Sequence, residues 1–274
     1  NSAYGNTAAS FDNVYRDKRN IDNIVAKRGA LFMTDLKEEV IKKGYTVAHT
    51  KTDSIKIPNA DSEIINFVIE FGKKYGYTFE HEATYDRMCL VNNSVYIAKF
   101  ATEDHCKFLY GDSIPVPKEN MKHGGEWTAT GAQFAVPYVY KTLFSKEKVE
   151  FKDFCETKST TTAIYLDLNE GMAEGEHNYH FVGKVGLFTP VLPGTGGGLL
   201  LRSSGEGKYA YLSGATGYRW MESEMVSNLG KEDKIDISYY KKLAEDAIDS
   251  ISEYGDFEIF VSDEAWHDEN DVPF

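Results

Sequence analysis

A stretch of ten residues most strongly limits what this chain can fold into: Val47-Ala48-His49-Thr50-Lys51-Thr52-Asp53-Ser54-Ile55-Lys56. Its pattern predicts two short β-strands, at residues 45–50 and 54–57, joined by a tight polar turn with Asp53 at the tip. The strands on both sides hold such a carboxylate in place, and rigid elements position metal ligands better than mobile loops. Asp, Ser and Thr are also ordinary turn residues, so a plain surface turn is the simpler interpretation of this stretch alone.

Apolar residues at helical spacing predict one helix on each side of this hairpin. The first covers residues 20–43 and ends at Gly44, and the second begins at residues 58–61 and continues to Gly76. The side chains expected to be buried are Ile24, Leu31, Phe32, Leu36, Val40 and Ile41 in the first helix, and Ile64, Ile65, Val68, Ile69 and Phe71 in the second.

Two further strands are expected at residues 77–90 and 94–100, separated by a turn at Asn92-Asn93. This order of helices and strands predicts an α+β fold, with helices packed on one face of an antiparallel sheet.

The second half of the chain has a different texture. Residues 111–127 are rich in Pro, Gly and charge and predict a linker or long loop. We therefore expect a domain boundary near residues 104–125, with one domain at residues 1–105 and another at residues 106–274. We expect strands at residues 161–168, 180–187, 199–202 and 208–212, and helices at residues 218–229 and 238–254, the latter capped by Ser238.

Composition excludes several classes of protein. The chain has 274 residues, 42% of them hydrophobic, which is ordinary for one large or two modest globular domains. It contains no apolar run near 18 residues, so no membrane span is expected. Cys89, Cys106 and Cys155 are odd in number and widely spaced, which predicts reduced thiols in place of a disulfide framework or a zinc site.

Four short motifs occur in an order that resembles family B DNA polymerases. Asn1-Ser2-Ala3-Tyr4-Gly5 resembles the NSxYG motif at the end of the fingers helix, and Lys51-Thr52-Asp53-Ser54 resembles the (D/N)TD(S/G) motif of the palm hairpin. Residues 79–85 and 93–96 then resemble the FEKVY and KKRY segments, and residues 137–144 and 155–158 resemble phage members of the family.

This resemblance implies the C-terminal part of a bacteriophage-type family B DNA polymerase, acting in the cytoplasm of a bacterial host. Residues 1–105 would then be the end of the fingers helix and the palm, and residues 106–274 a mixed α/β, thumb-like domain. The implied partners are primer–template DNA, deoxynucleoside triphosphates and the upstream polymerase domains, with no membrane.

Nucleotide addition in such enzymes uses two Mg²⁺ ions, which prefer oxygen ligands. Asp53 matches the palm carboxylate that binds both ions, whereas Lys51 stands where a first aspartate is common, which puts the outer ligand in doubt. A second essential aspartate of the family lies upstream of the NSxYG motif. The resemblance therefore implies that this polypeptide is inactive by itself.

The resemblance also assigns roles to other residues. Asn1, Tyr4 and Thr52 match nucleotide-binding positions, and Ser54 and Glu82 are expected to support Asp53. Tyr96 matches the Tyr of KKRY and is expected to contact the primer. Lys141 and Lys146 belong to a basic group, with Lys148, Lys152 and Lys158, that would grip duplex phosphates in a thumb. Interleaved acids also fit a mixed solvated surface.

Two other patterns have simpler interpretations. His177 and His180 could share a metal on a helix, whereas on a strand they would point to opposite faces. The glycine-rich residues 193–198 lack the GxxxxGK[ST] pattern and predict a turn, because no helix is expected to follow them.

Two alternatives to the polymerase hypothesis stay open. A net charge of −13 argues against a nucleic-acid surface spread over the whole chain. The loss of one palm acid, where Lys51 stands, and the loss of the KKRY cations fit a non-catalytic DNA-binding or replisome subunit from a split or decayed polymerase. The third hypothesis is an unrelated acidic interaction module with a coincidental turn.

Overall fold

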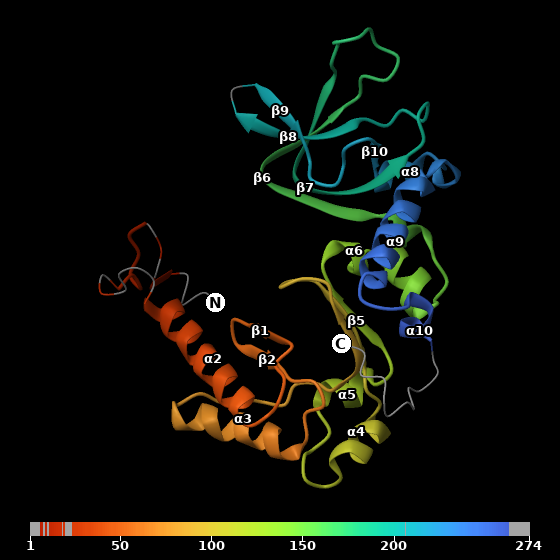
Figure 1. Cartoon of the computed structure of the whole chain (residues 1–274). Coiled ribbons are helices and arrows are strands. Elements are labelled where there is room, and N and C mark those ends of the chain that lie inside the picture. The colour runs from red at the N-terminus through yellow and green to blue at the C-terminus, as the bar shows by residue number, and fades with distance from the viewer. Residues whose placement is uncertain are drawn as a thin grey trace. The chain divides into compact units, whose positions relative to one another are not determined.

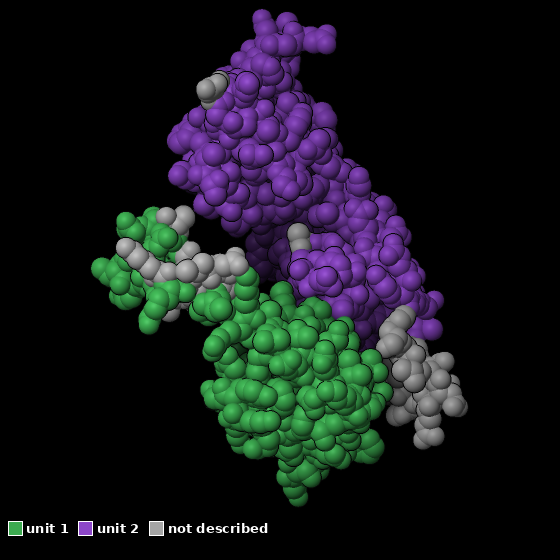
Figure 2. All heavy atoms as spheres, turned by 60° about the vertical axis from the view of Figure 1, so that its left-hand side comes forward, with its two compact units in different colours: residues 1–86, 99–125 green, residues 87–98, 126–274 purple. Residues whose placement is uncertain are grey.

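The computed structural model describes residues 6, 7, 9, 11–17, 19, 24–205 and 207–262 (Figure 1). The chain forms two compact units, coloured in Figure 2. The first comprises residues 1–86 and 99–125, and the second comprises residues 87–98 and 126–274. Helices accompany antiparallel sheets in this α+β fold, as the sequence predicted. The predicted division at residue 105 into palm and thumb stays a prediction.

The first unit begins with helix α2 (Ile24–Lys42), hairpin strands β1 (His49–Lys51) and β2 (Ser54–Lys56), and helix α3 (Ser62–Lys74). Helix α3 starts where predicted because the Asp61 carboxylate accepts a hydrogen bond from the Ile64 N–H, at 3.0 Å. Gly44 has a φ of +92° and follows the end of α2, so it acts as the predicted stop.

The buried face of α2 differs in part from the prediction. Leu36 and Val40 are buried as expected, together with Met33, but Ile24, Leu31 and Ile41 are about half exposed or more. The buried residues pack against Ile64 and Val68 of α3. Helical spacing shows which residues share a face, whereas the part of that face that is covered depends on the neighbouring helix.

The region after α3 also differs from the prediction. Residues 77–84 are not a strand; strand β3 spans Tyr85–Leu90 and is followed by β4 (Tyr96–Phe100) and β5 (Trp127–Thr130), in the sheet order β3-β4-β5. The expected linker at residues 111–127 contains helix α5 (Lys118–His123), which follows α4 (Glu103–Tyr110).

Asn120 explains why this segment is ordered. Its buried amide donates to the backbone oxygens of Thr84 and Ala101 and accepts from the Thr84 N–H, at 2.7 to 2.8 Å. A buried side chain with these bonds satisfied holds the segment against the unit's core.

Short helices connect β5 to the large sheet of the second unit. They are α6 (Ala132–Ala135), α7 (Pro137–Tyr140), a π-helical turn (Lys141–Ser145) and a 3₁₀ turn (Phe151–Phe154). Their apolar side chains, including Phe134, Val139 and Phe144, form a core with Ala247 and Ile251 of helix α9 (Ile237–Ser252) and Phe257 of α10 (Phe257–Val261).

The large sheet has five antiparallel strands in the order β10-β7-β6-β8-β9. The strands are β6 (Glu156–Asp167), β7 (Tyr179–Val191), β8 (Leu199–Gly205), β9 (Lys208–Tyr211) and β10 (Arg219–Glu222). The first four lie at or near predicted strands, because their β-branched and aromatic residues favour extended backbone. One face of the sheet packs Ile164, Leu200 and Trp220 against Tyr239 and Tyr240 of α9.

Two predictions in this region need correction. Residues 218–229 are not one helix: Arg219–Glu222 pair with β7 as strand β10, and only Ser223–Asn228 form helix α8. A 3₁₀ turn follows at Glu232–Lys234. Helix α9 is capped by Asp236, whose carboxylate accepts from the Ser238 N–H at 3.1 Å, so Ser238 is not its cap.

The three cysteines are free thiols, as the sequence predicted, and Cys89 and Cys106 are buried. Burial raises the pKa of the Cys89 thiol to about 11. In the part of the chain that the structure describes, no helix is both long enough and apolar enough to cross a membrane.

Candidate active site

The hairpin predicted from the ten-residue stretch is present. Strands β1 and β2 are antiparallel, and Lys51 pairs with Ser54, so Thr52 and Asp53 form a two-residue turn. Thr52 and Asp53 are exposed and Ser54 is half-buried. The turn therefore presents the Asp53 carboxylate to solvent, at the tip of a short ladder.

An apolar base holds this turn in position. Val47, Ile55 and Ile57, from the chain on both sides of the turn, pack into the core that α2 and α3 form. In Figure 1 the hairpin lies beside these two helices. The Tyr45 hydroxyl donates to Asp61 Oδ2 at 2.7 Å, so the residue that caps α3 also ties down the entry to β1.

That link perturbs the pKa values of both partners. The Ile64 N–H and then the Tyr45 hydroxyl lower the pKa of Asp61. In the other direction, the pKa of Tyr45 is raised to about 12, and the largest cause is the hydrogen bond that its hydroxyl makes with Asp61. Asp61 is thus a structural carboxylate, in contrast to Asp53.

Charges of both signs surround the hairpin. Lys56 is half-buried, and burial lowers its pKa while the nearby Glu82 carboxylate opposes that shift and Lys51 adds to it. Its ammonium lies 5.9 Å from the centre of the Tyr85 ring. The effect of Glu82 on Lys56 shows that the two side chains are near one another. Glu82 lies before β3, so it is not in a strand. Lys51 and Lys56 can attract the phosphates of a ligand toward the hairpin.

The donor set at Asp53 fits half of a magnesium site. Mg²⁺ binds through one or two protein carboxylates, and water and substrate phosphates complete its octahedron. Within the described residues, no group of three or more His, Cys, Asp or Glu side chains is placed to hold a metal. Asp53 can supply one such carboxylate ligand.

The remaining predicted site residues are dispersed. Asn1 and Tyr4 lie outside the described residues. Tyr96 begins strand β4 within the second unit, and its N–H donates to the Thr130 hydroxyl oxygen at 3.1 Å. Its expected contact with primer stays a prediction.

Most of the predicted basic group is already engaged with acids. Lys141 Nζ lies 3.0 Å from Asp153 Oδ2, and both side chains are largely buried. Lys158 pairs with Glu156 at 2.7 Å, and Lys152 pairs with Glu150 at 2.8 Å. Lys146 is exposed at the C-terminal end of the π-helical turn, and Lys148 is also exposed. These two lysines can meet a phosphate more readily than the three that are paired with acids.

The glycine-rich turn has an internal anion. Glu170 accepts hydrogen bonds from the N–H groups of Gly194 and Gly196, at 2.6 and 3.0 Å. These backbone donors are the groups that a phosphate loop would offer to its ligand. The segment leads into strand β8 and not into a helix, which confirms the prediction of a turn. The Glu170 carboxylate holds this turn in place.

His177 and His180 have different partners. His177 Nδ1 lies 2.7 Å from Oδ2 of the buried Asp167, whereas His180 on β7 lies 3.9 Å from Glu222. These contacts show that the two rings do not converge on one shared acidic partner.

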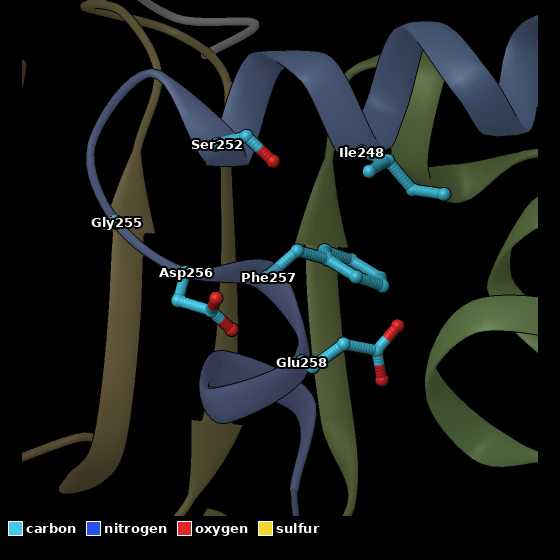
Figure 3. Close-up of a pocket in the computed structure, with 6 residues that line it drawn as sticks. All are labelled: Ile248, Ser252, Gly255, Asp256, Phe257 and Glu258. Carbon is cyan, nitrogen blue, oxygen red and sulfur yellow. The ribbon is translucent and has the colours of Figure 1, made fainter.

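An open depression of about 540 Å³ lies at the junction of α9 and α10. Figure 3 shows the residues that line it. Its lining residues are Ile248, Ser252, Gly255, Asp256, Phe257 and Glu258. The Asp256 carboxylate accepts from the Ile259 N–H at 2.9 Å and so caps α10. Because the lining is acidic and without a basic side chain, it does not suit a nucleotide phosphate.

Comparison with known proteins adds no relative to this picture. No family model matches the chain, and no curated protein matches it. The assignment of the candidate site therefore depends on its residues and on their geometry alone.

Proposed function

We propose that the chain is the C-terminal part of a template-directed family B DNA polymerase of bacteriophage type. The observation that carries the proposal is the exposed Asp53 carboxylate on a two-residue β-turn braced by α2 and α3. This is the local geometry that the Lys51-Thr52-Asp53-Ser54 motif leads one to expect of a palm hairpin. The encoded enzyme would act in the cytoplasm of a bacterial host.

In this proposal the residues of the hairpin have separate roles. Asp53 is the protein ligand that binds Mg²⁺, and Thr52 contacts the incoming deoxynucleoside triphosphate. Ser54 and Glu82 hold the turn and its charges in place, and Lys51 faces phosphate where other members carry an acid. Bound Mg²⁺ supplies activation of the primer 3′-hydroxyl and charge neutralisation at the leaving pyrophosphate.

Residues elsewhere in the chain complete the proposed enzyme. Asn1 and Tyr4 line the nascent base pair, and Tyr96 supports the primer strand near the reacting end. Lys146 contacts the duplex backbone; Lys141 contributes less, because its ammonium is bound to Asp153. The second metal-binding aspartate comes from an upstream polymerase segment.

Primer extension tests the proposal when the chain is joined to a segment that carries the upstream acidic motif. We expect Mg²⁺-dependent extension, and a rate at least about 10³-fold lower in Asp53→Asn, since a metal ligand contributes several kcal/mol and each 1.36 kcal/mol is a factor of ten. Asp112→Asn is the matched control, because Asp112 is another exposed aspartate of the same unit. It should extend at the wild-type rate.

The possible outcomes separate the three hypotheses. Full-rate extension by Asp53→Asn would remove this residue from the mechanism. Binding of primer–template without any extension by the joined wild type would favour the non-catalytic DNA-binding subunit. Failure to bind primer–template at all would leave the acidic interaction module.

A further inference from the structure

The two faces of the β1–β2 hairpin carry different kinds of side chain. Successive residues of a strand point to opposite faces, and cross-strand partners share a face. Ile55 packs into the core that α2 and α3 form, so its neighbours Ser54 and Lys56 point to the other face. Their partners across the hairpin are Lys51 and His49. We call these four residues the polar face of the hairpin.

Two lysines of the polar face are neighbours. Lys51 pairs with Ser54, and Lys56 lies two residues further along the strand of Ser54, so the lysines are diagonal partners. Diagonal partners in an antiparallel pair lie about 7–8 Å apart, a gap that long side chains can bridge. Burial is the largest cause that lowers the pKa of Lys56, and the positive charge of Lys51 adds to it, which agrees with this placement. Two ammonium groups can therefore reach one ligand.

The two lysines differ in how firmly they are held. Lys56 is half-buried, and its Nζ lies 5.9 Å from the centre of the Tyr85 ring. An aromatic ring at this distance attracts a cation and so favours one position of the ammonium. Lys51 is exposed beside the two-residue turn that carries Asp53. Lys56 therefore marks a defined point on the hairpin, and Lys51 extends the positive charge toward its tip.

Two carboxylates oppose this charge. Asp53 is exposed in the turn next to Lys51, and the Glu82 carboxylate partly offsets the effect of burial on the pKa of Lys56. Both acids reduce the attraction of the lysines for an anion. A cation held by Asp53 would remove the part of this repulsion that Asp53 causes. The lysines are therefore expected to bind an anion weakly without metal and more tightly with it.

A chain of linked phosphates fits the two lysines better than a single phosphate. Lysine binds phosphate as a point charge, and hydrogen bonds that involve a charged group are about twice as strong as those between neutral groups. Neighbouring phosphate groups of a triphosphate can each meet one of the two ammonium groups. Their negative charge also relieves the repulsion between the lysines, which a neutral ligand cannot do.

We propose that Lys51 and Lys56 together bind the triphosphate of a deoxynucleotide directly, with a formal charge equal to that of one Mg²⁺ ion. Because the ligand is taken to be the deoxynucleoside triphosphate, this assignment rests on the proposed function. A carboxylate at position 51 would reach phosphate only through a metal ion, whereas the ammonium of Lys51 contacts phosphate itself. The consequence is triphosphate binding that is partly independent of metal.

Fluorescence anisotropy of the full chain tests the lysine pair, with deoxyadenosine triphosphate labelled on its base, in buffer freed of divalent ions by a chelating resin. We expect the wild type to bind, and Lys51→Gln and Lys56→Gln each to bind about tenfold more weakly, because each loses one charged contact. Lys51→Asp reverses the charge and should reduce metal-free binding about 100-fold, while added Mg²⁺ should restore more affinity to it than to Lys51→Gln.

Unlabelled competitors identify the part of the ligand that is bound. Deoxyadenosine triphosphate should displace the label at the lowest concentration, the diphosphate at a higher one and the monophosphate at the highest. Equal displacement by the monophosphate would overturn the assignment to two lysines. Inorganic triphosphate is a fourth competitor. If it displaced the label better than the deoxynucleotide, the lysines would select the phosphate chain alone and the deoxynucleotide assignment would fail.

Two further variants serve as controls. Lys73→Gln removes one positive charge from the same unit, at an exposed lysine whose ammonium lies 2.6 Å from Glu70 Oε1, and should bind like the wild type. Asp53→Asn should bind more tightly than the wild type without metal, because it removes a repelling charge, and should gain less from added Mg²⁺. Lys51 is exposed, so Lys51→Gln keeps the test decisive if Lys56→Gln loses the wild-type circular dichroism spectrum.

Two results would overturn the lysine pair: no metal-free binding by the wild type, or binding by Lys51→Gln as tight as that of Lys73→Gln. Neither result depends on nucleotide addition. Primer extension that requires Asp53 could still be observed in both cases, so a failure of the lysine pair is distinct from a failure of the proposed function.

Discussion

The hairpin of the first unit and the sheet of the second unit use carboxylates in opposite ways. Asp53 is exposed at a turn tip. In the second unit, Asp153, Glu156, Asp167 and Glu170 instead bind a lysine, a lysine, a histidine and two backbone N–H groups of their own unit. An acid that is satisfied internally stabilises the fold, whereas an exposed acid on a rigid turn is available for a ligand. Location, and not residue type, separates the two roles.

The largest expected effect contrasts Asp153 with Asp53. The Asp153 side chain is 4% exposed, bonds Lys141 and accepts from the Glu150 N–H at 2.7 Å. Asp153→Ala would leave the largely buried Lys141 ammonium without its carboxylate partner, so it should lower the free energy of unfolding by about 3–5 kcal/mol. Asp53→Ala, at an exposed site, should change it by less than about 0.5 kcal/mol. Urea denaturation measures both, and similar losses would erase the proposed distinction.

An intermediate effect is expected at the glycine-rich turn. Glu170→Ala leaves the N–H groups of Gly194 and Gly196 without their carboxylate and should cost about 1–3 kcal/mol. Glu174→Ala is the control, because that acid is exposed in the same loop region. If added phosphate restores the stability of Glu170→Ala but not of the control, the turn is an anion site that the protein fills with its own side chain. Equal stability of the two variants would show that Glu170 does not stabilise the turn.

The smallest effect is a pH dependence in the first unit. Burial lowers the pKa of His81, whose Nε2 lies 3.0 Å from the Thr84 hydroxyl oxygen. The unfolded chain then binds a proton at a higher pH than the folded chain does. The resulting stability is present above the ordinary histidine pKa and is lost as pH falls through the lowered value, with a slope of at most about 1.4 kcal/mol per pH unit.

Chemical denaturation between pH 7.5 and pH 5 measures this slope. His81→Gln should flatten it, because the buried imidazole is then absent. A slope that His81→Gln leaves unchanged would assign the pH dependence to other groups.

Local signals were sufficient for several elements and for part of the site. The turn at Thr52-Asp53 and the Asp61 cap of α3 depend on residues within a few positions of one another, so the sequence predicts them. The same holds for the strands rich in β-branched and aromatic residues. Alternation of Tyr179 with Phe181, and of Tyr209 with Tyr211, was also present as a strand signal. The alternation does not show that these rings lie together, because only the register across four strands brings them to one side of the sheet.

Other features were beyond any local pattern. Residues 219–222 become a strand because β7 offers a partner, although their own sequence fits a helix. The five lysines of the basic group look alike in sequence, yet three of them are paired with acids.

The sequence by itself determined the α+β class, the hairpin and the residue at its tip, because short-range turn, cap and alternation rules act within a few residues. Only the tertiary structure decided which acids are internal, which face of α2 is covered, and that rings from separate strands contact one another. Those outcomes depend on contacts between residues far apart in the chain, whose partners no local pattern specifies.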